Sequence, residues 1–367
     1  MSARRTPAEL VRPAIRRLSA YRVPDPGDAL KLDAMENPYG WPESMRTAWL
    51  ERLRDVPLNR YPDPAARRLG EAIRRHVGLP EEMGLLLGNG SDELIQMILM
   101  TVAGEGRRVL APEPTFVMYR MIAEVLGLDY RGVPLGEDFA LDAEAMLAAI
   151  RAHDPEVVFL AYPNNPTGNL FEREAVEAIL DTATGLVVVD EAYSAFASDS
   201  FLPALGRWPN LLVMRTLSKT GLAGLRLGML MGPPEWLGEI DKTRLPYNIN
   251  VLTQVSATFA LEHAEVLEAQ CARIRDDRAV LFERLEAMEG VHPWPSEANF
   301  ILFRVPQGQG RAVFEGLKAR GVLVKAFGDT GPLADCLRVT VGTPEENARF
   351  LEALAETLEG EKPEAGR

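Results

Sequence analysis

Cysteine, histidine and long apolar runs are all scarce in this chain of 367 residues. Its two cysteines, Cys271 and Cys336, show no CxxC or metal-ligand spacing, so we expect no metal site and a reducing, cytoplasmic setting. The four histidines are scattered, which argues against a zinc centre or a serine–histidine triad. No apolar run approaches the roughly 18–20 residues that cross a bilayer, and the basic N-terminal segment lacks the apolar part of a signal peptide.

Positive charge is also in deficit. The chain carries 53 acidic residues against 40 basic ones, for a formal net charge of −13. That balance argues against a nucleic-acid partner or an anionic membrane surface, because like charges repel. It leaves room for a positive pocket that binds a small anionic molecule.

Short apolar runs alternate with helical patterns through the middle of the chain. The runs end near Leu87, Leu110, Leu160, Asp190 and Thr216. This alternation predicts an α/β fold with a mostly parallel sheet covered by helices. From residue 251 onward a long helical pattern leads into a smaller α+β unit. We therefore predict a large domain at residues 36–255 and a small domain built from residues 1–35 and 256–367.

Two turn-rich motifs follow strands of this predicted sheet, where ligands of such sheets bind. Residues 88–93, Gly-Asn-Gly-Ser-Asp-Glu, open a helix whose N-terminus favours a phosphate. Glu93 replaces the third glycine of a dinucleotide fingerprint, and a plain helix cap at Ser91 is the alternative. Residues 163–168 form a turn in which Asn165 could donate to a ring oxygen, although a generic turn explains the same residues.

Two ionisable side chains at strand ends indicate a binding site more specifically than these turns do. Asp190 ends a run of valines, where a carboxylate needs a cationic partner. Lys219 follows the next apolar run, beside Thr216, Ser218 and Arg226. A surface acid and a surface lysine are the alternatives. With Tyr193, these residues supply what pyridoxal phosphate requires: an amine for a Schiff base, an acid for the ring nitrogen, a phenol for the ring oxygen and a cation for the phosphate.

The motifs, taken in order, resemble the fold type I pyridoxal-phosphate-dependent aminotransferase superfamily. Within it they are most similar to the histidinol-phosphate aminotransferase family. The resemblance covers nearly the whole chain and rests on residues 32–40, 60–64, 88–93, 112–116, 163–168, 189–193, 215–228 and 337–343.

This resemblance implies a set of cofactor contacts. Lys219 is the expected Schiff-base lysine, Asp190 the partner of the pyridine nitrogen, and Tyr193 the partner of the ring oxygen. Phe116 is expected to stack on the ring, with Tyr119 close enough to compete. The implied contacts to pyridoxal phosphate are completed by Gly90, Ser91, Asp92, Asn165, Thr216, Ser218, Arg226 and Tyr61.

The resemblance also implies how substrates and partners bind. Arg338 is expected to clamp the α-carboxylate of glutamate, while Tyr21 and Asn37 line the substrate pocket. Lys325 stands where the family usually places an arginine for the substrate phosphate. A lysine keeps the positive charge but cannot form the two parallel hydrogen bonds that an arginine makes with a phosphate. Tyr61 is expected to reach the site of a neighbouring subunit, which implies a homodimer.

The activity implied by the resemblance is amino transfer between L-histidinol phosphate and 2-oxoglutarate, in histidine biosynthesis. An aromatic or broad-specificity aminotransferase and an O-phosphothreonine decarboxylase of the same fold are the alternatives. The decarboxylase differs in which Cα bond is aligned with the cofactor ring, which sequence spacing does not reveal. A more distant alternative is a regulator that binds pyridoxal phosphate without catalysis.

Overall fold

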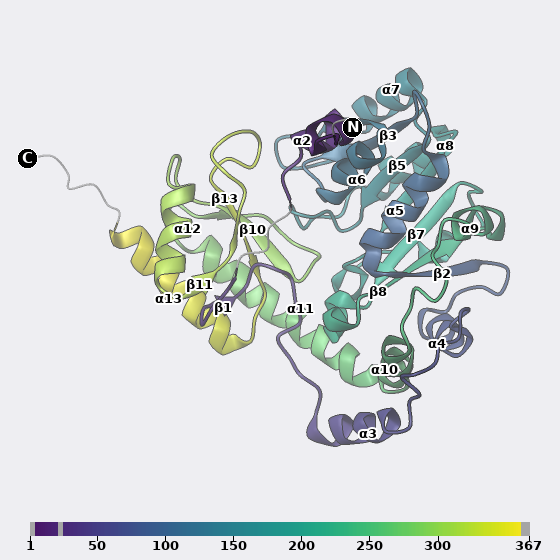
Figure 1. The fold of residues 1–367 in the computed structure, drawn as a ribbon. Helices are drawn as coiled ribbons and strands as arrows, with labels where there is room; N and C mark the ends of the chain where they lie inside the picture. Colours follow the sequence, from purple (N-terminus) through teal and green to yellow (C-terminus); the bar gives the residue numbers. More distant parts are fainter. Residues whose placement is uncertain (1–3, 21–24, 361–367) are drawn as a thin grey trace, which may run out of the picture.

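The computed structural model describes residues 4–20 and 25–360, and a large twisted sheet organises most of them (Figure 1). Its strands are β2 (Gly84–Asn89), β3 (Arg108–Glu113), β4 (Asp129–Pro134), β5 (Val157–Ala161), β6 (Leu186–Asp190), β7 (Leu211–Thr216) and β8 (Leu227–Gly232). Their order is β2-β8-β7-β6-β5-β3-β4. Strand β8 runs antiparallel to β2 and β7, whereas β4, β3, β5, β6 and β7 pair in parallel.

Helices cover both faces of this sheet. One face packs against α4 (Arg67–Val77), α7 (Ala143–His153), α8 (Arg173–Thr182) and α10 (Val251–Glu262). The other packs against α5 (Gly90–Val102), α6 (Met118–Leu126) and α9 (Pro234–Asp241). Side chains alternate across β6, so that Val187 and Val189 join the first cluster while Leu186 and Val188 join the second. A strand buried on both faces reads as a continuous apolar run, which is the pattern seen in the sequence.

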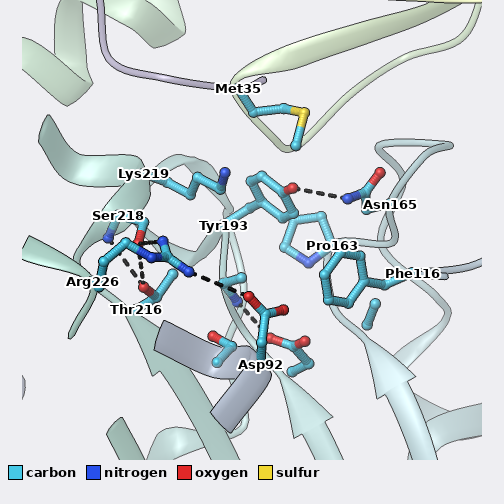
Figure 2. Close-up of a pocket in the computed structure, with 14 residues that line it drawn as sticks. Met35, Asp92, Phe116, Pro163, Asn165, Tyr193, Thr216, Ser218, Lys219 and Arg226 are labelled. Atoms are coloured by element: carbon cyan, nitrogen blue, oxygen red, sulfur yellow. Dashed lines mark hydrogen bonds and ion pairs between the residues drawn. The ribbon is translucent and has the colours of Figure 1, made fainter. Parts of the chain in front are cut away.

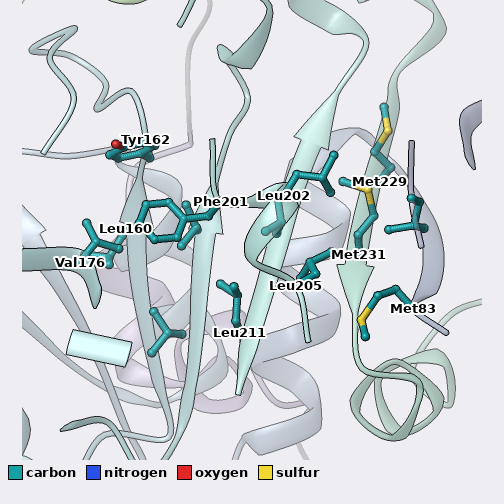
Figure 3. Packing of buried hydrophobic residues seen from close by; sticks show 14 of the residues in the cluster. Met83, Leu160, Tyr162, Val176, Phe201, Leu202, Leu205, Leu211, Met229 and Met231 are labelled. Atoms are coloured by element: carbon teal, nitrogen blue, oxygen red, sulfur yellow. The ribbon is translucent and has the colours of Figure 1, made fainter. Parts of the chain in front are cut away.

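The segment after β6 packs back onto the first of these faces. It contains two short helical turns, η1 (Ser194–Phe196) and η2 (Leu202–Ala204), and Figure 3 shows Phe201, Leu202 and Leu205 lying over the sheet. The buried Glu191 carboxylate holds this segment, because it accepts hydrogen bonds from the Ser200 hydroxyl at 2.9 Å and the Phe201 amide at 2.5 Å. Arg215 pairs with the same carboxylate at 2.7 Å. The chain directly after Asp190 is therefore fixed.

A smaller unit lies beside the large sheet (Figure 1). Its four-stranded sheet has the order β12-β13-β10-β9, from β9 (His292–Pro293), β10 (Phe300–Arg304), β12 (Lys325–Ala326) and β13 (Cys336–Thr340). A separate pair joins β1 (Leu30–Lys31) to β11 (Val322–Leu323). The helices are α11 (Ala264–Glu286), α12 (Gly310–Ala319) and α13 (Pro344–Gly360). Their shared core includes Phe300, Phe303, Val339 and Phe350.

The remaining helices lie near the N-terminus: α1 (Pro7–Leu10), α2 (Pro13–Arg17) and α3 (Glu43–Leu53). The domain division stays a prediction, although two observations bear on residues 1–35. Strand β1 pairs with β11 of the small unit, whereas α2 packs against α6, where Arg12 donates to the carbonyl of Val125. None of the helices in the described ranges combines the length and apolarity of a bilayer crossing.

The predicted α/β class with a mostly parallel sheet is confirmed. Five of the seven large-sheet strands end close to the predicted positions. The sequence analysis did not anticipate β4 and β8. Strand β4 lies at the sheet edge and exposes Arg131 and Gly132, so its apolar pattern is weak. Strand β8 follows the short helical turns of residues 218–225, and its buried apolar run was not recognised as a separate strand.

Candidate active site

A pocket opens where β5, β6 and β7 end and α5 begins. Figure 2 shows side chains from these elements pointing into it, with Met35 from a distant segment above them. The structure brings together ten residues predicted from the sequence: Ser91, Asp92, Phe116, Asn165, Asp190, Tyr193, Thr216, Ser218, Lys219 and Arg226. Four lining residues were not predicted as site residues: Met35, Ala161, Pro163 and Ala192. The parallel strands produce this convergence, because their carboxyl ends meet at one edge.

The carboxylate of Asp190 is buried at the end of β6. Its Oδ2 accepts a hydrogen bond from the Tyr119 hydroxyl at 2.7 Å, and its Oδ1 accepts one from the Ala192 amide at 3.1 Å. Burial raises the pKa of Asp190 to about 6, while these two donors act in the opposite direction. Among the described residues no cation forms an ion pair with Asp190, so the site favours a ligand that brings a positive charge.

Phe116 and Tyr119, which competed for the ring-stacking role, occupy different places. Phe116 lines the pocket. Tyr119 is fully buried behind it, stacked on Phe159 with ring centroids 4.5 Å apart and its hydroxyl on Asp190. The position of Phe116 therefore favours it as the ring contact. Sequence reasoning missed the contact of Tyr119 with Asp190; a tyrosine on the apolar face of α6 was the available signal.

Lys219 lies in a tight turn after β7, residues Ser218–Leu222, which bends at Gly221 with a φ of 111°. Its Nζ donates to the carbonyl of Ala34 at 3.2 Å. Burial, together with the charges of Arg338 and Arg226, lowers the pKa of Lys219 to about 8. A buried amine with a pKa near neutrality acts as a nucleophile and as a proton acceptor.

An anion cradle lies at the N-terminus of α5. Gly90 has a φ of 78°, and a Cβ built there would stand 2.6 Å from Arg226 Nη2, so only glycine lets the guanidinium approach. The Ser91 hydroxyl is buried without a hydrogen-bond partner among the described residues. Thr216 donates to the Ser218 hydroxyl at 2.9 Å, and Arg226 Nη2 lies 3.3 Å from Asp92 Oδ2. These groups surround the positive end of a helix, where an anion is stabilised.

Asn165 connects the pocket to Arg338. Its Nδ2 donates to the Tyr193 hydroxyl at 3.0 Å, and its Oδ1 accepts a hydrogen bond from Arg338 Nη1. Arg338 Nη2 also donates to the carbonyl of Asp33 at 3.0 Å. Asn165 and the backbone of residue 33 therefore orient the guanidinium beside the pocket.

Three other predicted site residues, Tyr61, Asn37 and Lys325, are not among those that line the pocket. Tyr61 is 80% exposed and stacks on Tyr247 with centroids 4.4 Å apart. The Asn37 amide donates to Gln270 Oε1 at 3.0 Å, a partner that the sequence did not suggest. Lys325 is exposed on β12, directly opposite Arg338 on β13. Tyr21, also predicted to line the substrate pocket, lies outside the described residues.

These residues fit pyridoxal phosphate on the evidence of their own chemistry. The cradle offers a helix N-terminus, an unsatisfied hydroxyl and a guanidinium, all suited to a phosphate. The Asp190 carboxylate suits a protonated ring nitrogen, and Lys219 supplies the amine. No group of three or more His, Cys, Asp or Glu side chains suited to a metal ion occurs within residues 4–20 and 25–360.

Comparisons with known proteins give a consistent result. A family model described as aminotransferase class I and II matches residues 27–354. The chain is 61% identical to histidinol-phosphate aminotransferase 2 of Nitrosococcus oceani, across 95% of this chain and 97% of the relative. It is 52% identical to histidinol-phosphate aminotransferase 1 of Ralstonia nicotianae, across 95% of each chain.

Solved structures agree. Histidinol-phosphate aminotransferase from Sinorhizobium meliloti, in complex with pyridoxal-5'-phosphate, superimposes with a TM-score of 0.86 at 26% identity, covering 96% of this chain and 98% of that one. L-Threonine-O-3-phosphate decarboxylase from Porphyromonas gingivalis has a TM-score of 0.77 at 20% identity, covering 90% and 99%. Because its sequence identity is so low, the similarity to the decarboxylase shows only that the two proteins share a fold.

The low pKa of Lys219 makes a prediction about its reactivity. In the cofactor-free protein, the rate of Lys219 acetylation by a trace of acetic anhydride should rise with a midpoint near pH 8, because only the neutral amine reacts. The side-chain amine of lysine in a model peptide has a pKa of ~10.4, so roughly 0.4% of it is neutral at pH 8. About half of Lys219 should be neutral at the same pH. Mass spectrometry of the peptide that carries Lys219 measures this. A midpoint above pH 10 would contradict the burial of the amine.

Proposed function

Since this chain belongs to the class I and II aminotransferases, and within them to the histidinol-phosphate aminotransferase family, we propose that it transfers an amino group between L-histidinol phosphate and 2-oxoglutarate, as a step of histidine biosynthesis. We also propose that pyridoxal phosphate is its cofactor. One observation carries the proposal: the buried Lys219 amine, the buried Asp190 carboxylate and the anion cradle line a single pocket.

Most of the polar residues of the pocket have a part in this chemistry. Pyridoxal phosphate, when bound, supplies an electron sink for the charge that remains at Cα after deprotonation. Lys219 Nζ would hold the cofactor covalently and, once the amino group of the donor has displaced it, would take the proton from Cα of the donor, a role suited to its pKa of about 8. Asp190 pairs with the ring nitrogen, and Tyr193 with Asn165 binds the ring oxygen. Gly90, Ser91, Thr216, Ser218 and Arg226 would bind the phosphate around the start of α5, together with the backbone amide of Asp92.

Substrate recognition belongs to the small unit. Arg338 binds the α-carboxylate of glutamate, oriented by its hydrogen bonds to Asn165 and to the carbonyl of Asp33. Lys325 binds the phosphate of the donor. Directly opposed residues on antiparallel strands project to the same face, so Lys325 and Arg338 lie side by side. The two cations can thus contact the carboxylate of one substrate and the phosphate of the other.

We also propose that the protein is a homodimer in which Tyr61 enters the partner's site. Tyr61 and Tyr247 form an exposed stacked pair. Their segments are joined by hydrogen bonds from Arg244 to the carbonyl of Pro64 and from Gln254 to the carbonyl of Asp63. Leu58, Leu245 and Leu252, which are near these residues in the sequence, are also exposed, and such apolar side chains favour burial against a second copy.

A donor panel tests the activity. With 2-oxoglutarate as acceptor, the protein should transaminate L-histidinol phosphate faster than phenylalanine, tyrosine or O-phosphothreonine. Borohydride reduction of the loaded protein should leave the cofactor on Lys219, and Lys219→Ala should abolish turnover while retaining some cofactor through the phosphate contacts. Labelling of another of the six lysines would contradict the assignment. Faster reaction of an aromatic donor, or carbon dioxide release from phosphothreonine, would favour an alternative activity.

Lys325 provides a test of phosphate recognition. Lys325→Ala should lower kcat/KM for histidinol phosphate by roughly tenfold to a hundredfold, because a charge-assisted contact contributes about 1.5–3 kcal/mol. Glutamate in its own half-reaction should be hardly affected. Lys325→Arg keeps the charge and should retain the donor. Single-turnover rates with both amino donors measure this; equal losses for both, or none for either, would refute selective recognition by Lys325.

Mixed dimers test the placement of Tyr61. Tyr61→Phe keeps the ring on Tyr247 but removes the hydroxyl, so it should weaken cofactor binding by about tenfold. In a dimer of one Tyr61→Phe chain and one Lys219→Ala chain, the site that has Lys219 receives Tyr61 from its partner. Differently tagged chains allow that dimer to be purified, and its lysine-bearing site should regain parental affinity. Continued weak binding there, or a monomeric parent protein, would contradict the shared site.

A further inference from the structure

Tyr119 lies behind the pocket and takes no part in the chemistry assigned above. Its side chain is fully buried on α6, and its ring lies nearly parallel to that of Phe159 on β5, with an interplanar angle of 7°. The stacking fixes the direction of the hydroxyl, which donates to Asp190 Oδ2 at 2.7 Å. A phenylalanine would fill the same apolar space without a polar group to bury. The hydroxyl therefore has a specific acceptor in Asp190, because burying it unpaired would cost free energy.

Asp190 needs such a donor because its other neighbours oppose a negative charge. Burial is the largest influence, and the nearby carboxylates of Asp92 and Glu191 act in the same direction. The Tyr119 hydroxyl and the Ala192 amide are the groups that act against them. Each occupies one oxygen of the carboxylate, so together they fix the plane of the group. Only a proline at position 192 would remove the backbone donor, whereas Tyr119→Phe removes the hydroxyl and keeps the ring.

We propose that Tyr119 is a positioning residue, whose hydroxyl holds the Asp190 carboxylate charged and oriented toward the pocket for the ring nitrogen of the cofactor. The inference rests on the proposed function, since it assumes that pyridoxal phosphate binds in this pocket. Tyr119 acts through Asp190 and does not itself line the pocket. Its loss should weaken the pairing of Asp190 with the ring and leave the phosphate cradle unchanged.

The chain offers a matched control for this hydroxyl. Tyr162 is likewise buried at the same sheet edge and donates to a carboxylate, Asp199 Oδ2, at 2.8 Å. Asp199 is paired with Arg173 and does not line the pocket. Tyr119→Phe and Tyr162→Phe therefore remove the same kind of bond, but only the first touches Asp190.

The experiment measures binding of pyridoxal phosphate to cofactor-free parent and variant proteins, by the absorbance of the bound cofactor. Tyr119→Phe should raise the Kd by about tenfold, the size of one lost hydrogen bond to a charged group. Tyr162→Phe should leave the Kd within about twofold. Thermal melting of both variants checks that they fold. An unchanged Kd in Tyr119→Phe would overturn the proposal.

Two further binding measurements distinguish a positioning role of Tyr119 from a role in packing alone. The first uses 1-deazapyridoxal phosphate, which lacks the ring nitrogen, and the second introduces Tyr119→Phe into an Asp190→Ala background. The tenfold effect should disappear in both measurements, because the pairing through which Tyr119 acts is absent. The same loss of affinity in either measurement would show a packing role and overturn the proposal. A parent protein that binds no pyridoxal phosphate would instead overturn the proposed function, and this inference with it.

Discussion

A carboxylate buried at the end of a central strand costs free energy unless hydrogen-bond donors or a cation face it. Asp190 has two donors, the Tyr119 hydroxyl and the Ala192 amide, yet its pKa is still raised to about 6. Burial also lowers the pKa of Lys219 to about 8, so both groups are disfavoured in their charged forms. A ligand with a cationic ring offsets the burial of Asp190. A covalent link through Lys219 removes the need to hold an ammonium ion there.

Packing elsewhere keeps this arrangement rigid. Glu191, next to Asp190, is tied to Arg215 and to the segment that begins at Ser200. These bonds turn the side chain after Asp190 away from the pocket and fix the end of β6. On the neighbouring strand end, Asn165 joins the Tyr193 hydroxyl to Arg338. The residues proposed for the cofactor oxygen and for the substrate carboxylate are therefore positioned by one amide.

The pocket is completed by a segment far away in sequence. Met35 lines it with a backbone held from two sides, since its amide donates to the Thr340 hydroxyl and its carbonyl accepts from Asn299. The preceding carbonyl, of Ala34, accepts from Lys219. The segment before the large sheet thus connects the small unit to the reactive lysine. A shift of the small unit would alter Arg338 and the surroundings of Lys219 together.

The sequence by itself determined the α/β class and the strands that carry Asp190 and Thr216, because buried parallel strands and glycine-rich turns have local signatures. Its resemblance to a known family added the assignment of ten of the residues that line the pocket. The sequence did not determine the antiparallel pairing of β8 or the edge strand β4, whose apolar pattern is weak. Only the tertiary structure showed the hydrogen bonds of Tyr119 with Asp190 and of Asn37 with Gln270, and the pairing of Lys325 with Arg338 on neighbouring strands. These contacts join residues far apart in the chain, and their partners are set by how helices and strands pack, which local sequence does not encode.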